Sequence, residues 1–364
     1  MRGEKISGDE KRKYSIEEIA NICHVSKATV SRVINNSATG VGKETRARVQ
    51  KVIDSLNYRP NNLAQSIATA RSRMIGLIVP DVSNFFYPKI IRSVTDYMNG
   101  KGYAVLIGNS DYDPEKEAAQ LLNMIDKRVD GIILCSGVSN ATFLEDFRKY
   151  KVPLALIGRS FDSSLSDVSI TGDNEKGAYK SASYLIEGGN RRIVYVEGNP
   201  KISGSIQRLR GYRSALEDAG LPFDPELVLS GEYSIEYGKR AADYLVDQKI
   251  DFDAVMTGSD LIAIGIVSGL LKRGIRIPEE IELVGFDNIE LSGVFHPPLT
   301  TISKPHYDMA QHISRQLINI IEGKEPSLTH MQVEPSCNSR NNERANVKDA
   351  LFFKHYAQKI KIIS

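Results

Sequence analysis

Residues 26–35 combine an apolar stripe with a cationic and polar face. Val30, Val33 and Ile34 recur at the i, i+3 and i+4 spacing of a buried helix stripe. The opposite face carries small, polar and basic residues and no acidic one: Lys27, Ala28, Ser31 and Arg32. Such a face can enter the major groove of DNA, hydrogen-bond to base edges and neutralise phosphates. Ser26 stands where an N-cap residue would begin this helix.

A second short helix is predicted just before this stretch. Ser15 and Glu18 have the spacing of a capping box. The helix that they begin has one apolar face, formed by Ile16, Ile19 and Ala20. Only residues 22–25 separate it from Ser26, and two helices joined by so tight a turn form a helix-turn-helix. A third helix is expected, with a buried face formed by Val49, Val52, Ile53 and Leu56. The alternative is an ordinary small helical bundle with a solvated basic face.

Residues 15–68 resemble the DNA-binding headpiece of the lactose/galactose repressor family of bacterial transcriptional regulators. The run 25–35 (VSKATVSRVIN) matches the family's recognition helix, and 45–46 (TR) and 56–61 (LNYRPN) match its third helix and exit. The resemblance continues to about Arg340 and covers most of the chain. It implies base contacts from Lys27, Ala28 and Arg32. It also implies phosphate contacts from Ser15, Thr29, Ser31, Asn35 and Thr45, and Ser26 completes the candidate DNA-binding residues of the headpiece.

Residues 60–72 are expected to form a hinge. Pro60 ends the third helix, and the residues after it are too few to form a helix that is stable alone. In the resembled family, hinge helices fold when two subunits meet on operator DNA, and an apolar side chain wedges open a base step in the minor groove. The resemblance assigns these contacts to Asn61, Ala64 and Ile67, with Ile67 in place of the usual Leu. The alternative is a plain polar linker.

Two headpiece residues depart from the family pattern. His24 replaces the Gly that is common in the turn, and we expect it to adopt the positive φ that His tolerates better than most residues. Gly42 replaces the Ser that usually caps the third helix, at a cost of a few tenths of a kcal/mol. Neither departure conflicts with the predicted helix-turn-helix.

Charge is unevenly distributed along the chain. The 364 residues carry a formal net charge of +2. Residues 1–59 hold 12 lysines and arginines and 7 aspartates and glutamates, a net of +5, which leaves −3 on the remainder. A basic head on a slightly acidic body is typical of a DNA reader attached to a domain with another role. The length and a hydrophobic content of 41% predict two or three globular domains.

Cysteine usage and hydropathy predict a cytoplasmic protein without membrane contact. Cys23, Cys135 and Cys337 have no metal-like spacing, and the first two lie among apolar residues, as buried thiols do. The N-terminal segment is polar and charged, unlike a signal peptide, and no apolar run approaches ~20 residues.

From Met74 onward, short apolar runs alternate with amphipathic helices, which predicts parallel sheets covered on both faces. One series of runs is 75–80, 104–108, 131–135 and 154–158, and a second is 192–196, 254–257 and 282–286. The predicted fold is an all-α helix-turn-helix headpiece plus an α/β core of two doubly wound parallel-sheet subdomains, similar to periplasmic binding proteins. The expected chain crossovers between the subdomains lie near residues 172 and 303.

These patterns divide the chain into five parts. They are an extension expected to be disordered (1–13), the helix-turn-helix domain (14–59), the hinge (60–72), the effector-binding and dimerisation core (73–340) and a C-terminal extension (341–364). The last part carries apolar and basic patches but no sustained leucine heptad, so a homodimer is expected rather than a tetramer.

Polar side chains stand at the ends of the predicted strands, where ligands of open α/β sheets bind. Arg208, in a segment 207–212 expected to open a helix, and Asp287 match the effector-binding Arg and Asp of the resembled family. Tyr233 falls where an aromatic ring commonly packs on a sugar face. The full candidate effector site is Asp81, Phe86, Asn109, Arg159, Arg208, Tyr233, Ser259, Asp260 and Asp287. Arg159 would favour an acidic ligand such as a sugar acid or a sugar phosphate.

These residues also have ordinary structural explanations. Asp81, Asp260 and Asp287 can each serve as the N-cap of the helix that follows. Tyr233 can be a core aromatic, and Arg208 can form a surface ion pair of little energetic consequence. The agreement of strand-end position and family motif favours Arg208 and Asp287 as ligand-binding residues.

No catalytic, cofactor or metal motif is present. The sequence contains no Walker A loop, GxGxxG, GxSxG or HExxH pattern, and its six histidines form no metal-like cluster. We therefore expect a homodimeric repressor of carbohydrate-metabolism genes that binds operator DNA and is controlled by a small sugar-like effector. Two alternatives remain, namely the same fold regulated by a phosphoprotein co-repressor and a non-regulatory sugar-binding protein. The basic helix-turn-helix disfavours the second.

Overall fold

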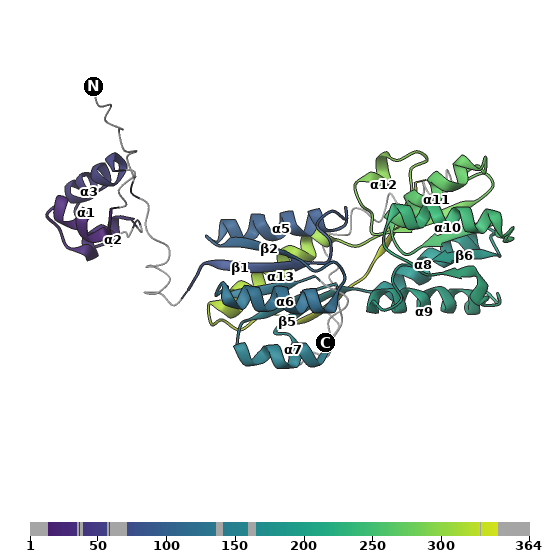
Figure 1. Ribbon diagram of the computed structural model, residues 1–364, viewed down its shortest axis with the longest axis horizontal. Coiled ribbons are helices and arrows are strands. Elements are labelled where there is room, and N and C mark those ends of the chain that lie inside the picture. Colours follow the sequence, from purple (N-terminus) through teal and green to yellow (C-terminus); the bar gives the residue numbers. More distant parts are fainter. Residues whose placement is uncertain are drawn as a thin grey trace, which may run out of the picture. The chain divides into compact units, whose positions relative to one another are not determined.

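The structure is a computed structural model, and it describes residues 14–34, 36, 39–56, 58, 71–135, 141–158, 165–327 and 329–340. The chain divides between Ser72 and Arg73 into an N-terminal unit and a C-terminal unit. The described part of the first unit is helical, and the second unit contains two β-sheets covered by helices (Figure 1).

Three helices form the described part of the N-terminal unit: α1 (Ile16–Ile22), α2 (Lys27–Ile34) and α3 (Lys43–Ser55). The capping box is confirmed, since Glu18 N–H donates to Ser15 Oγ at 3.2 Å and Ser15 N–H donates to Glu18 Oε2 at 2.8 Å. Ser26 Oγ likewise accepts from Thr29 N–H at 3.1 Å and begins α2. One side chain from each helix, namely Ile19, Val30 and Val49, is fully buried in the small core between them.

Of the two departures from the family pattern, His24 behaves as predicted, and Gly42 stands at the N-cap of α3. His24 lies in the turn between α1 and α2 with a φ of 52°, in the left-handed region. Gly42 precedes α3 with extended backbone and makes no side-chain cap bond. Because α1 and α2 are held by their own caps and by shared apolar contacts, the exposed face of α2 has a fixed support.

The first lobe of the C-terminal unit is built on a parallel sheet with the order β11-β5-β4-β3-β1-β2. Helices α5 and α13 pack on one face of the sheet, and α6 and α7 on the other (Figure 1). Its strands are β1 (Met74–Val79), β2 (Ala104–Asn109), β3 (Gly131–Leu134), β4 (Leu154–Ile157), β5 (Val168–Gly172) and β11 (His330–Val333). Its helices are α5 (Tyr87–Gly100), α6 (Pro114–Asp126), α7 (Ala141–Phe147), α13 (His306–Ile321) and the 3-10 helix η1 (Arg148–Tyr150).

The second lobe repeats this plan with the strand order β12-β10-β9-β8-β6-β7, in which only β12 is antiparallel to its neighbour. Helices α10 and α11 cover one face of the sheet, and α8 and α9 the other. The strands are β6 (Ile193–Val196), β7 (Val228–Leu229), β8 (Ala254–Thr257), β9 (Glu282–Phe286), β10 (Thr300–Ser303) and β12 (Ser336–Asn338). The helices are α8 (Asn174–Glu187), α9 (Ser203–Asp218), α10 (Ile235–Asp247), α11 (Asp260–Lys272), α12 (Leu291–Val294) and the 3-10 helix η3 (Pro225–Leu227).

The chain passes between the lobes at three places in the described residues. It leaves the first lobe after Gly172, returns after Ser303, and crosses again between Val333 and Ser336. The all-α headpiece and the two parallel-sheet lobes confirm the predicted fold class. The third crossing and the strands β5, β7, β10, β11 and β12 were not predicted, because these runs are short or carry polar residues.

Two pairs of helices in the second lobe pack so closely that glycine is required at the contact. A Cβ on Gly265 of α11 would overlap the carbonyl oxygen of Ile235 at the start of α10. A Cβ on Gly211 of α9 would overlap the carbonyl oxygen of Glu175 in α8. The second contact fixes the position of α9, which carries Arg208.

Candidate functional site

The outer face of α2 presents the residues that the sequence assigned to DNA. Lys27, Ala28 and Arg32 are exposed, whereas Thr29 and Ser31 are half-buried. Lys27 Nζ lies 2.8 Å from Glu17 Oε1 of α1, with both side chains more than half exposed. An exposed pair of this kind contributes about 0–1 kcal/mol, so a phosphate can replace the carboxylate at little cost.

Two further candidates flank this face. Ser15 Oγ accepts the N-cap hydrogen bond of α1, and Thr45 is half-buried in the first turn of α3. Asn35, Asn61, Ala64 and Ile67 lie outside the described residues, as does Arg159 of the candidate effector site.

A cavity of about 110 Å³ lies between the two lobes of the C-terminal unit. Residues that follow β4, β5, β8, β9 and β10 line it, so it lies at the carboxyl ends of parallel strands from both sheets. This is the position at which open α/β sheets bind ligands. The polar side chains that line it are Asn84, Tyr87, Tyr112, Asn174, Ser203, Arg208, Tyr233, Ser259, Asp287, Lys304 and His306.

Arg208 is held at the cavity by α9 and is 7% exposed. Its guanidinium donates to Tyr233 Oη and, at 3.3 Å, to Asn174 Oδ1. The guanidinium carbon also lies 4.8 Å from the centroid of the Phe286 ring. These contacts fix a charged, planar donor group against the cavity wall, which is the arrangement that recognises a carboxylate, a phosphate or a vicinal diol.

The aromatic rings in the cavity come from both lobes. Tyr233 and Tyr112 lie with ring centroids 6.1 Å apart, one from the second lobe and one from the first. Phe86, which precedes α5, packs edge-on against the His306 ring at 4.5 Å. Flat apolar surfaces on two sides of a narrow cavity suit a ring-shaped ligand with polar edges.

Asp287 and Lys304 form a buried ion pair. Lys304 Nζ lies 3.8 Å from Asp287 Oδ1, with side-chain exposures of 8% and 14%. Burial lowers the pKa of Lys304 to about 8, and the neighbouring Arg208 acts in the same direction while Asp287 opposes it. Burial also raises the pKa of Asp287, against the effect of Lys304 and Arg208. Both charged forms are therefore less stable here than in water.

The backbone at Asp287 is strained. Its φ is 108°, and that of the following Asn288 is 52°, values that L-residues rarely adopt. Asp287 N–H donates to Ile302 O at 2.8 Å, which ties the turn to β10. Strain of this kind persists where surrounding structure holds a functional group in place.

Comparison with known proteins identifies the two units. Residues 15–61 match the family described as "Bacterial regulatory proteins, lacI family", and residues 72–348 match "Periplasmic binding proteins and sugar binding domain of LacI family". The chain belongs to the LacI family. It is a DNA-binding transcriptional regulator rather than an enzyme.

Similar LacI-family proteins span nearly the whole chain. The transcriptional regulator RegA of Clostridium acetobutylicum is 38% identical over 319 residues, which is 87% of this chain and 95% of RegA. Catabolite control protein A of Priestia megaterium is 34% identical over 304 residues, 83% of this chain and 91% of that protein. The structure of the lac repressor dimer bound to operator and the anti-inducer ONPF has a TM-score of 0.81 at 22% identity. That match covers 90% of this chain and 98% of the repressor chain, and it supports the fold.

Five of the predicted effector residues of this LacI-family chain line the cavity: Phe86, Arg208, Tyr233, Ser259 and Asp287. Helix α9 begins at Ser203, earlier than the predicted start near Gln207, so Arg208 stands in its second turn. Ser259 is also the N-cap of α11, since its Oγ accepts from Ile262 N–H at 3.3 Å.

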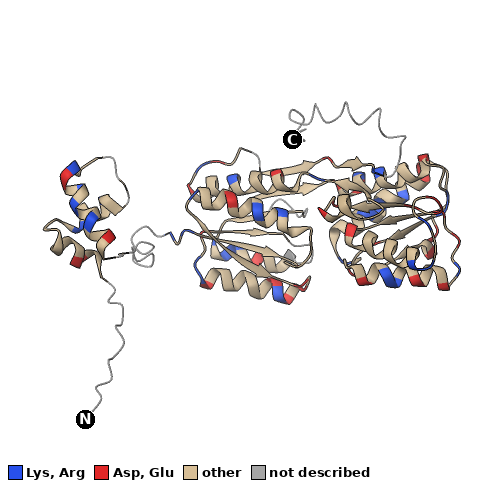
Figure 2. Ribbon diagram, turned by 90° about the horizontal axis from the view of Figure 1, so that it is seen from above, with Lys and Arg blue, Asp and Glu red and all other residues tan. Residues whose placement is uncertain are grey.

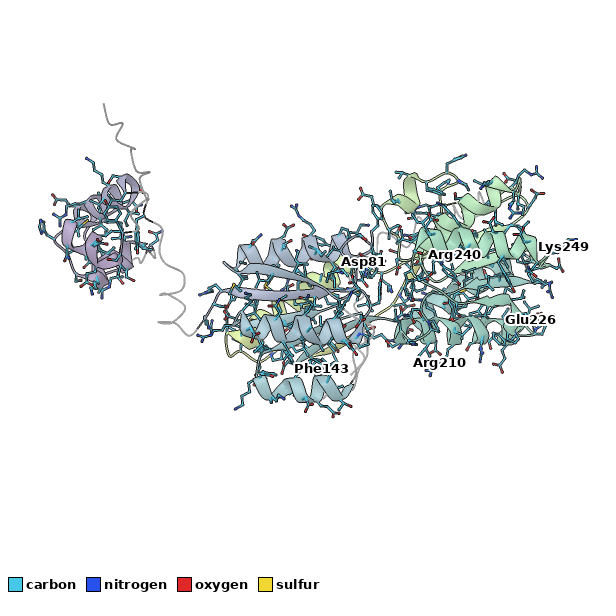
Figure 3. All side chains as sticks on the ribbon, in the orientation of Figure 1. Asp81, Phe143, Arg210, Glu226, Arg240 and Lys249 are labelled. Carbon is cyan, nitrogen blue, oxygen red and sulfur yellow. The ribbon has the colours of Figure 1, made fainter. Side chains whose placement is uncertain are left out.

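Asp81, Asn109 and Asp260 support the cavity from outside its lining. Asp81 accepts from the N–H and the O–H of Ser83, and Asn109 Oδ1 accepts from Val82 N–H at 2.8 Å. These bonds shape the loop before α5, and Asp81 lies at the end of the first lobe nearest the second (Figure 3). None of the three is among the cavity-lining residues.

Asp260 is fully buried at the first position of α11. It accepts from Thr301 O–H at 2.6 Å and from Ile289 N–H at 2.9 Å, so it holds the turn that carries Asp287. Burial raises its pKa to about 7. The N-cap of α11 is Ser259, so Asp260 does not serve as that cap.

Three cavity-lining residues were not predicted from the sequence, namely Lys304, Asn174 and His306. All three lie just after a strand end at a lobe crossing, on segments that were expected to be connectors. His306 is 8% exposed, burial lowers its pKa well below its usual value, and its Nε2 has no hydrogen-bond partner among the described residues. The signal that could have found them is their position one to three residues after the crossovers expected near 172 and 303.

No metal-binding cluster of His, Cys, Asp and Glu occurs within the described residues. Cys23 and Cys135 are buried thiols there, as predicted. Among those same residues, no helix has the length and apolar character needed to cross a membrane.

Proposed function

We propose that this LacI-family regulator is a homodimeric repressor of carbohydrate-metabolism genes, acts in the cytoplasm, and is controlled by a small sugar-like effector bound between its lobes. The observation that carries the proposal is the cavity with Arg208, Asp287 and Tyr233 converging on it, in a chain whose N-terminal unit is a helix-turn-helix. A DNA reader joined to a ligand cavity has the parts of a ligand-controlled switch.

On the DNA side, α2 would lie in the major groove. Lys27, Ala28 and Arg32 are exposed on one face of this helix and would contact base edges. Phosphate contacts are assigned to Ser15, Thr29, Ser31, Asn35 and Thr45, and minor-groove contacts to Asn61, Ala64 and Ile67, with Ser26 as a further DNA-binding candidate. Two headpieces in a two-fold dimer would read a near-palindromic operator, because the protein symmetry is mirrored in the DNA.

On the effector side, Arg208 and Asp287 would hold polar groups of the ligand bidentately. Tyr233 and Phe86 would cover the apolar face of its ring, as aromatic side chains do in carbohydrate sites. The description of the family match as a sugar binding domain supports this ligand class.

Coupling between the two sites would run through the lobe crossings. Asn174 and Lys304 line the cavity within two residues of the first and second crossing. A ligand that bridges the lobes therefore contacts the segments about which the lobes turn. If ligand binding favours one lobe arrangement and operator DNA favours one, each changes the affinity for the other by the same factor.

The test is a panel of sugars, sugar acids and sugar phosphates, scored by the thermal unfolding of the full-length protein. A ligand at 100 times its Kd should stabilise the folded core by about 2.7 kcal/mol. The expected result is a stabilising ligand whose effect is lost in Arg208→Ala and which changes the affinity for DNA selected from a random library. A protein that binds its selected DNA but responds to no ligand in the panel would contradict the effector part of the proposal.

A further inference from the structure

We propose that the effector carries an anionic group, a carboxylate or a phosphate, which binds between Lys304 and Arg208. This inference rests on the proposed effector function and names the chemical class of its ligand. In the cavity, the cationic side chains of Lys304 and Arg208 face a single carboxylate, that of Asp287.

The two cations are directed at one point. Lys304 Nζ donates to Asn174 Oδ1 at 3.2 Å, and Arg208 Nη1 donates to the same oxygen at 3.3 Å. The Arg208 guanidinium carbon and Lys304 Nζ each lie 4.8 Å from the centroid of the Phe286 ring, whose face attracts positive charge. Asp287 provides one carboxylate for these two buried cations, and their other partners, the Asn174 amide oxygen, the Tyr233 hydroxyl and the Phe286 ring face, are neutral. The lining of the cavity is therefore short of one negative charge.

The other acidic groups near the cavity are not among its lining residues. Glu197, after β6, is buried and accepts from Ser230 O–H, and burial raises its pKa against the effect of Arg208. Asp81 accepts hydrogen bonds from Ser83 and is not among the cavity-lining residues. Lys89 of α5 is likewise outside the lining, with its Nζ 3.4 Å from Asn288 O.

The outer surface of the two lobes differs from the cavity. Lys and Arg lie among Asp and Glu over the outer helices of both lobes (Figure 2). The excess of positive charge is thus a local property of the cavity. Burial of an ion is costly unless it is paired, so a persistent excess is expected where a ligand completes the pairing.

An unused hydrogen-bonding atom on a lining residue fits an anion with several acceptor oxygens. His306 Nε2 has no hydrogen-bond partner within the described residues, and its side chain is more than nine-tenths buried. A carboxylate or a phosphate group would accept from Lys304, from the guanidinium and from His306 in its Nε2–H form. A neutral hydroxyl would satisfy one donor and leave the excess charge unpaired.

The test uses full-length protein and the variants Lys304→Gln, Lys304→Arg and Lys272→Gln. Lys272 is exposed in the last turn of α11, so its substitution removes an equal charge away from the cavity. The probes are inorganic phosphate and acetate at ionic strength matched with chloride, then glucose 6-phosphate, glucuronate and glucose. Circular dichroism and DNA binding establish that each variant is folded.

We expect phosphate or acetate to raise the unfolding midpoint of the wild type and of Lys272→Gln, with at least tenfold weaker binding to Lys304→Gln. Lys304→Arg keeps the charge and should retain most of the affinity. Whichever of phosphate and acetate binds more tightly identifies the anionic group of the effector. If phosphate binds more tightly, glucose 6-phosphate should bind more tightly than glucuronate, and if acetate does, the reverse should hold. Because burial lowers the pKa of Lys304 to about 8 and a bound anion would raise it, proton uptake on binding at pH 8 should be larger in the wild type than in Lys304→Gln.

An equal response of wild type and Lys304→Gln to the anions, or no response of the wild type, would overturn the proposal. If neutral sugars alone stabilise the protein and do so through Arg208, the sugar-effector function stands and only the anionic class is wrong. If a protein that binds its DNA responds to neither neutral nor anionic probes, the effector function fails as well.

Discussion

Arg208 and Lys304 donate to the same oxygen, Asn174 Oδ1, although they come from a helix of the second lobe and from the segment that crosses back to the first. Asn174 itself begins α8, directly after the first crossing. The polar centre of the cavity is thus assembled on the connections between the lobes. A ligand that changes these two hydrogen bonds acts on the connections themselves.

Replacing Arg208 should weaken effector binding. Arg208 lines the cavity, and a charge-assisted hydrogen bond from its guanidinium to a ligand would contribute about 1.5–3 kcal/mol. We expect Arg208→Ala to weaken effector binding by at least about 2 kcal/mol, measured by isothermal titration calorimetry. Arg210, which is exposed two residues further along α9 (Figure 3), provides the control, and Arg210→Ala should bind like the wild type.

The pKa of Lys304 predicts a pH dependence of stability. It is about 8 in the folded protein against an ordinary value of 10.5, so between these values the unfolded chain binds more protons. The contribution of this group to the free energy of unfolding therefore rises with pH from about 8 to 10.5, by up to about 1.4 kcal/mol per pH unit.

Urea unfolding of the wild type and of Lys304→Gln across that pH range isolates this contribution as a difference. The wild type should gain stability relative to Lys304→Gln as pH rises, while Lys272→Gln should run parallel to the wild type. A pH-independent difference between wild type and Lys304→Gln would show that Lys304 titrates normally.

Arg32 is expected to carry base specificity. It is exposed on the outer face of α2, and a bidentate contact to a base is worth about 1–3 kcal/mol. Arg32→Ala should lose that much affinity for the selected operator and much less for random DNA, as measured by fluorescence anisotropy. The control is Arg48→Ala, which removes an equal charge from an exposed position of α3. Equal losses on both DNAs would mean that Arg32 contacts only phosphate.

The capping box of α1 should make a measurable contribution to the local stability of this helix. Ser15→Ala removes the acceptor for Glu18 N–H, at a typical cost of about 1 kcal/mol. Amide hydrogen exchange in the full-length protein should show lower protection in α1, and Ser15→Thr should retain most of it. Unchanged protection in Ser15→Ala would rule out a stabilising role for this cap.

Close helix packing in the second lobe predicts a large effect from one methyl group. Gly265→Ala would force α11 against the carbonyl oxygen of Ile235 and should destabilise the core by more than about 1 kcal/mol. Gly100, the last residue of α5, has no atom within 4 Å of the corresponding position, so Gly100→Ala should be close to neutral. Thermal unfolding of both variants compares the two sites directly.

Much of the fold follows from local sequence patterns. The helices α1 and α2 were predictable because Ser15, Glu18 and Ser26 are caps whose bonds are local, and seven strands were predictable as apolar runs. Strands such as β5 and β11 were missed because alternate residues are exposed or polar, as in Val168–Gly172. Their pairing joins residues 330–333 to 169–172, and no local pattern encodes such a distant contact.

The candidate site was predictable only in part. Arg208, Tyr233 and Asp287 line the cavity from positions that the family resemblance specified. Asp260 was proposed for the same role, yet its carboxylate is directed to Thr301 and Ile289, because burial depends on the packing of α11 against neighbouring strands. Lys304 was missed because a lysine after a strand normally points to solvent, and only the crossing of the chain buries it.

The central claim is that a ligand in the cavity controls DNA binding. The most direct measurement is the affinity of the full-length protein for its selected operator, with and without a saturating ligand from the panel, in wild type and Arg208→Ala. The account predicts a change of at least fivefold in the wild type, within the usual range of allosteric coupling, and none in Arg208→Ala. An equal change in both proteins, or a ligand that stabilises the wild-type core without altering operator affinity, would contradict it.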